Sequence, residues 1–124
     1  MNGSNDEIAI KELTAGSQNK DELVEVFAAF QREAQIMSCL DHPNLVALLG
    51  VTAAKHPMYM VMEFVPGGTL FELLHSSISD KDLDWGLRAR LALDISKGMN
   101  YLHTVTPPYI HRDLRSPNIL VSIK

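Results

Sequence analysis

The stretch HRDLRSPN, residues 111–118, decides how the rest of this sequence is interpreted. It lies between two apolar runs, PPYI at 107–110 and ILVSI at 119–123. A carboxylate on a rigid loop, such as that of Asp113, can accept a proton from a substrate hydroxyl. The amide oxygen of Asn118, five residues further on, is a hard neutral ligand suited to Mg²⁺. Either residue alone is also common in turns, so the assignment depends on the combination.

The bulk composition limits the classes of function. The chain has 124 residues, with 11 Lys plus Arg and 15 Asp plus Glu, and its formal net charge is −4. This acidic balance argues against nucleic acid or an anionic membrane as the main partner. No apolar run reaches the roughly 20 residues of a membrane span, and the polar start at 1–7 predicts no secretory signal, so a cytoplasmic location is expected. The single cysteine, Cys39, lies in a helical pattern and is expected to be a small buried hydrophobe.

Alternating and short apolar runs predict the strands of an α+β chain in two segregated parts. The strands are expected at 7–13, 45–51, 58–64 and 119–123. The second and third of these are expected to pair in the antiparallel sense, because only a short loop separates them. The turn VPGG at 65–68 is the expected boundary between segments 1–64 and 65–124.

Apolar residues at spacings of three and four predict the helices. The first helix begins after Asn19, and its apolar stripe consists of Leu23, Phe27, Phe30, Ala34, Met37 and Leu40. A second helix is expected at 69–75. A third is expected from Trp85, after an N-cap at Asp84, to about His103. Its inner face is made by Leu91, Ile95, Gly98 and Leu102.

The pattern H-R-D-L-x-x-x-N at 111–118 resembles the catalytic loop of protein kinases. The resemblance implies that Asp113 is the catalytic base and that Asn118 is a Mg²⁺ ligand. It also places Arg115 where kinases acting on Ser or Thr mostly carry a lysine that meets the transferred phosphate. Arg115 supplies a permanent cation with a different geometry. Since RSPN lacks the small-residue pair of tyrosine kinases, Ser/Thr is the favoured acceptor and Tyr stays open.

The segment IAIK at 8–11 resembles the kinase V-A-I-K strand. Lys11 would then hold the α- and β-phosphates of ATP, and it needs a glutamate partner on the following helix. Glu33 borders the apolar stripe in mid-helix, within a passage that resembles helix C and the start of the fourth strand of kinases. Glu22 and Glu25 also lie near the stripe, but at the helix start, where acidic residues suit the helix dipole. Glu33 is therefore the expected partner of Lys11.

The segment YMVMEFVPGGTL at 59–70 looks like the fifth strand and hinge of a kinase. The resemblance implies that Met62 borders the adenine pocket. Glu63 and Val65 would offer backbone groups to the adenine edge, so their side chains are expected to matter little. By the same resemblance, Ala9 and Leu120 would enclose the adenine ring from its two faces.

The motifs together are most similar to the tyrosine-kinase-like group and, within it, to Roco-type kinases. This implies a bilobal kinase-like fold, present in part. Segment 1–64 would hold part of the small lobe: its third strand, helix C, and fourth and fifth strands. Segment 65–124 would hold the hinge and the start of the large lobe through the catalytic loop. The implied cofactors are ATP and Mg²⁺, the implied partner is a protein substrate, and further domains of a longer chain are expected.

Two kinase motifs are not found in the printed sequence. The glycine-rich G-x-G-x-x-G loop should precede Lys11, where Gly3 is the only glycine, and D-F-G should follow Asn118 by about a dozen residues. We therefore expect a kinase segment that is incomplete at both ends and inactive by itself, from a protein that transfers phosphoryl groups to protein hydroxyls. The alternative is a non-catalytic, kinase-like binding or regulatory module.

Overall fold

The computed structural model describes residues 7–13, 16, 19–52, 57–76 and 83–122. It divides the chain into two compact units. The first unit comprises Met1–Asp41 and Leu45–Phe64, and the second comprises His42–Asn44 and Val65–Lys124. Gly3 lies outside the described residues, as do residues 14–15, 17–18, 53–56, 77–82 and 123–124. Among the described residues, no helix combines the length and the apolar character that crossing a membrane requires.

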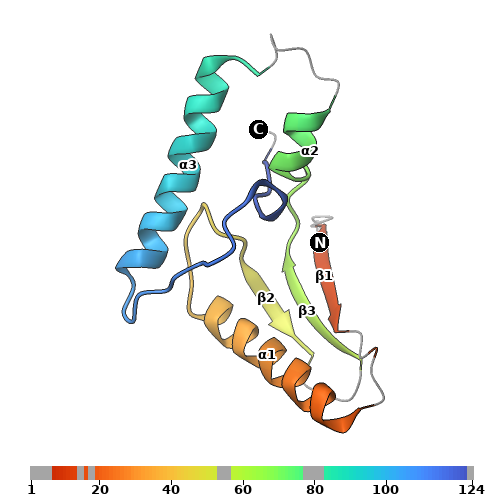
Figure 1. Cartoon of the computed structure of the whole chain (residues 1–124). Helices are drawn as coiled ribbons and strands as arrows, with labels where there is room; N and C mark the ends of the chain where they lie inside the picture. Colours follow the sequence, from red (N-terminus) through yellow and green to blue (C-terminus); the bar gives the residue numbers. More distant parts are fainter. Residues whose placement is uncertain (1–6, 14–15, 17–18, 53–56, 77–82, 123–124) are drawn as a thin grey trace, which may run out of the picture. The chain divides into compact units, whose positions relative to one another are not determined.

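The first unit contains an antiparallel sheet with the strand order β1-β3-β2 (Figure 1). Its strands are β1 (Ile8–Leu13), β2 (Leu48–Val51) and β3 (Met58–Glu63). The predicted pairing of the second and third strands is confirmed, but β2 begins three residues later than the expected start at 45. The ladder is irregular there, because the register shifts between Leu48 and Gly50. A bulge of this kind interrupts regular pairing at the end of an edge strand.

Helix α1 (Lys20–Ser38) supplies the other half of the first unit's core. Asn19 is its N-cap, as predicted, and its side chain accepts a hydrogen bond from the backbone N–H of Asp21. The helix places Phe30 and Ala34 against Met58 and Met60 of β3, and all four side chains are buried. Figure 1 shows the helix lying across one face of the sheet. The amphipathic stripe therefore packs on the strand that β1 and β2 flank.

The prediction of a buried Cys39 is wrong, because the thiol is exposed. Helix α1 ends at Ser38, and Cys39 is the C-cap. A residue beyond the last helical turn no longer follows the 3.6-residue period that carries the stripe into the core. The helical pattern in the sequence continues past the point at which the chain stops being helical.

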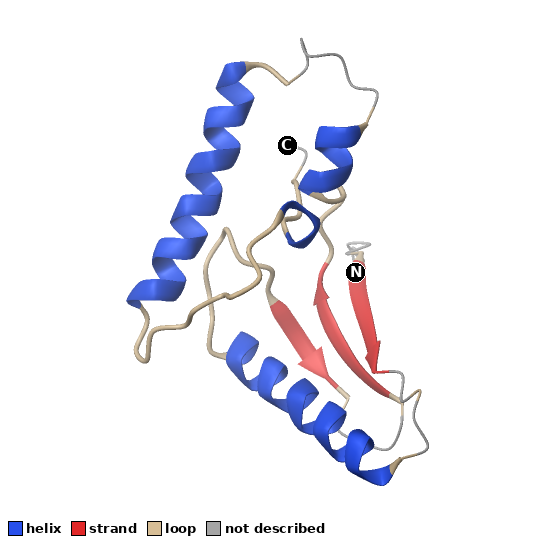
Figure 2. Cartoon of the chain, in the orientation of Figure 1, coloured by secondary structure: helices blue, strands red, loops and turns tan. Residues whose placement is uncertain are grey.

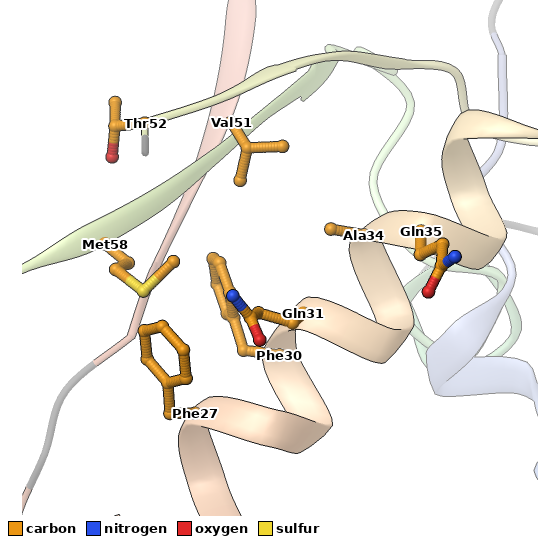
Figure 3. A pocket seen from close by; sticks show the side chains of 8 residues that line it. All are labelled: Phe27, Phe30, Gln31, Ala34, Gln35, Val51, Thr52 and Met58. Carbon is orange, nitrogen blue, oxygen red and sulfur yellow. The ribbon is translucent and has the colours of Figure 1, made fainter. Parts of the chain in front are cut away.

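A hollow of about 440 Å³ lies between α1 and the neighbouring strands of the first unit. Figure 3 shows its eight lining side chains, which are Phe27, Phe30, Gln31, Ala34, Gln35, Val51, Thr52 and Met58. All of them are apolar or neutral polar groups, and none titrates near neutral pH. The hollow therefore offers neither an acid–base group nor a charge for a phosphate, and the catalytic candidates lie elsewhere.

The second unit is mainly helical (Figure 2). Its elements are α2 (Leu70–His75), α3 (Trp85–Thr104) and a short 3-10 helix, η1 (Ser116–Asn118). Asp84 caps α3, as predicted, and its carboxylate accepts from the backbone N–H of Leu87 at 2.7 Å. Of the predicted inner face of α3, Gly98 and Leu102 are buried. Helix η1 ends at Asn118, the candidate metal ligand, so the backbone of this residue belongs to a helical turn.

The strand predicted at 119–123 is not formed within the described residues up to 122. In its place, Leu120 makes an isolated antiparallel bridge with Thr69. Two backbone hydrogen bonds flank the bridge, from Leu70 N to Ile119 O at 2.7 Å and from Val121 N to Gly68 O at 2.9 Å. The partner segment of this apolar run is only a few residues long, because α2 begins at Leu70. The run therefore has too few partner residues there to form a longer ladder.

Candidate active site

The structure brings Lys11 and Glu33 together in the first unit. Lys11 lies on β1 opposite Met60 of β3, and Glu33 precedes the buried Ala34 on α1. The Lys11 Nζ atom donates to both carboxylate oxygens of Glu33, at 2.8 and 2.9 Å. The side chains are 49% and 44% exposed, and an exposed pair of this kind contributes only about 0–1 kcal/mol to stability. Its value therefore lies in fixing the position of the ammonium group.

The structure also gathers Asp113, Arg115 and Asn118 in the second unit. The Asn118 Nδ2 atom donates to the Asp113 carboxylate at 2.8 Å and to the Asp113 backbone carbonyl at 3.0 Å. The Arg115 Nε atom lies 3.0 Å from the other carboxylate oxygen. Asp113 is held on both oxygens, yet its side chain is 59% exposed. The carboxylate is thus oriented and still accessible to an incoming hydroxyl.

Two further features fix the backbone of this loop. The His111 Nδ1 atom accepts a hydrogen bond from the Asp113 N–H at 3.2 Å. Arg112, between them, has a φ of 66°, in the left-handed region that costs an L-residue about 1–2 kcal/mol. Strained backbone of this kind concentrates at functional sites, where the surrounding contacts hold it in place. The sequence carries no signal for this conformation, since arginine has no preference for it.

Asn118 fits the role of a Mg²⁺ ligand. Both of its described hydrogen bonds use Nδ2, so its amide oxygen is turned away from Asp113. That oxygen is a hard neutral donor, which is the type Mg²⁺ accepts. Within the described segments, no three His, Cys, Asp or Glu side chains cluster in a way that could hold a metal ion. Mg²⁺ commonly takes some of its ligands from nucleotide phosphates.

The residues expected near adenine fall in both units. Ala9 and Met62 lie opposite each other in the β1–β3 ladder, and Glu63 ends β3. Val65 and Leu120 belong to the second unit, where Leu120 makes the bridge to Thr69. The Glu63 carboxylate has a partner that the sequence did not reveal, because its Oε2 atom accepts from the Ala47 N–H at 3.2 Å. No short-range motif marks a contact between residues 16 apart.

A capping box at the start of α2 was also missed. The Thr69 hydroxyl accepts from the Glu72 N–H, and the Glu72 carboxylate accepts from the Thr69 N–H at 2.7 Å. The hydrogen bonds that the Glu72 carboxylate accepts, first from the Thr69 backbone N–H and second from the Thr69 hydroxyl at 3.0 Å, lower the pKa of Glu72. The pattern T-x-x-E before an apolar run is a known sequence signal for this box, so it was available in TLFE at 69–72.

Comparison with known proteins decides the family. The model of the family described as "Protein tyrosine and serine/threonine kinase" matches residues 1–124. The chain belongs to this family. The kinase resemblance of the catalytic loop and the predicted α+β fold class are thereby confirmed. The kinase segment also has curated relatives of the predicted Roco type.

One relative is the Dictyostelium discoideum protein named "Probable serine/threonine-protein kinase roco6", which is 47% identical over 118 residues, covering 94% of this chain and 5% of the relative. A second, from the same organism, is "Probable serine/threonine-protein kinase roco11", at 42% identity over 92% of this chain and 7% of the relative. "Serine/threonine-protein kinase CTR1" of Arabidopsis thaliana is 45% identical over 77% of this chain and 12% of the relative. The kinase segment thus spans a small part of the length of these proteins.

Proposed function

We propose that this kinase segment takes part in ATP-dependent phosphoryl transfer to Ser or Thr hydroxyls of protein substrates. The observation that carries the proposal is the Asp113 carboxylate, which Asn118 and Arg115 orient on its two oxygens while it stays accessible. The relatives' printed names, which specify serine/threonine kinases, support the choice of acceptor.

In the proposed mechanism, the oxygen of the substrate hydroxyl attacks the γ-phosphorus of ATP, and Asp113 accepts the proton of that hydroxyl. The bond between the γ-phosphorus and the leaving ADP oxygen breaks. Asn118 holds the carboxylate in the orientation needed to receive that proton. Arg115, beside the carboxylate, offers a permanent positive charge to the transferred phosphoryl group. Proton acceptance and charge compensation are thus provided within one loop.

Lys11 has the task of holding the α- and β-phosphates. Its ammonium group has three donors, and the Glu33 carboxylate fixes the direction of the side chain by taking a hydrogen bond on each oxygen. A Mg²⁺ ion held by Asn118 and the phosphates would neutralise phosphate charge when bound. Residues Ala9, Met62 and Leu120 are proposed to contact adenine, together with the backbone of Glu63 and Val65.

Replacing Asp113 by Asn in the full-length protein tests the proposal. The amide keeps the shape of the side chain but cannot accept the proton, so kcat should fall by roughly 10² to 10⁴ while Mg·ATP affinity stays near that of the wild type. Steady-state kinetics and calorimetric titration measure the two effects. Asp94→Asn, at an exposed position on α3, is the matched control and should leave both unchanged.

Retention of more than half of the wild-type turnover by Asp113→Asn would refute the role of Asp113. A wild-type protein that binds Mg·ATP but transfers no phosphoryl group to any Ser, Thr or Tyr substrate would instead support the non-catalytic binding module.

A further inference from the structure

No further inference is drawn: the strongest candidate, the open hollow that α1 lines together with β2 and β3 in the first unit, is a largely apolar surface, and nothing among the described residues shows what covers it.

Discussion

The Lys11–Glu33 pair joins residues 22 apart in the sequence, whereas the described hydrogen-bond and ion-pair partners of Asp113 lie within five residues of it. The first arrangement depends on packing, because α1 holds Glu33 close to Lys11 only while Phe30 and Ala34 stay buried against β3. The second depends on the local course of the chain, including the left-handed backbone of Arg112.

The difference predicts which perturbations should affect the Lys11–Glu33 pair and which should affect the loop at 111–118. A change in the core of the first unit should separate Lys11 from Glu33 and leave the loop at 111–118 as it is. A change in the segment that anchors residues 119–121 should do the reverse. The following experiments use the full-length protein and follow this contrast from the largest expected effect to the smallest.

Phe30→Ala should break the first arrangement. Phe30 is 3% exposed, and truncation of a buried Phe to Ala costs about 3–5 kcal/mol. Hydrogen exchange measured by mass spectrometry should show α1 and β3 opening more readily, with residues 111–118 unaffected. Val24→Ala is the matched control, because Val24 lies on the same helix and is 67% exposed. Equal loss of protection in the loop and in α1 would contradict the contrast.

Gly68→Ala should act on the second arrangement. Gly68 has a φ of +71°, and an added Cβ would lie 2.7 Å from the Glu72 Oε2 atom of the capping box. The left-handed backbone and the disturbed cap together cost about 2 kcal/mol. Since Val121 N donates to Gly68 O, the segment after the loop should lose protection, while Lys11–Glu33 stays intact.

The control for that variant is Gly50→Ala on β2. An added Cβ there has no neighbour within 4 Å, and Gly50 does not adopt a positive φ. Exchange protection should be close to that of the wild type. Wild-type protection of residues 119–121 in Gly68→Ala would show that the bridge does not depend on this glycine.

A double-mutant cycle sharpens the contrast at the Lys11–Glu33 pair. Lys11→Met and Glu33→Gln each remove the same ion pair, so their effects on kcat/KM should not add. The effect of each change on stability should stay below about 1 kcal/mol, since the pair is half exposed. Glu25→Gln, at an exposed position on α1, is the control and should have no effect. Additive losses of activity would disprove that the two side chains act as one unit.

The smallest expected effect is a pH dependence at the capping box. The pKa of Glu72 in the folded protein is lowered, so the box stabilises α2 above the ordinary pKa of a glutamate. This contribution should be lost as the pH falls through the lowered pKa. Hydrogen exchange of the α2 amides, corrected for the pH dependence of the intrinsic exchange rate, should reveal this loss of protection. Glu72→Gln should abolish the pH dependence. If the pH dependence of α2 exchange persists in Glu72→Gln, another titrating group causes it.

The sequence by itself determined the features that follow from spacing and from local chemistry. Asn118 follows Asp113 by five positions, and that spacing is short enough for one loop to join the two side chains. The N-caps at Asn19 and Asp84 also follow from local signals, because a cap side chain bonds to an amide two or three residues further on. For the same reason, the capping box in TLFE at 69–72 lay within reach of the sequence.

Only the tertiary structure decided the features that depend on distances across the chain. It brought Lys11 and Glu33, the pair expected from the kinase resemblance, within hydrogen-bond distance, because the burial of Phe30 and Ala34 sets the rotation of α1 against the sheet. It also brought the Glu63 carboxylate to the Ala47 amide, next to a register shift between β2 and β3 that no residue type in the sequence predicts. Such contacts arise when packing closes long loops of chain, and a one-dimensional pattern does not encode where those loops meet.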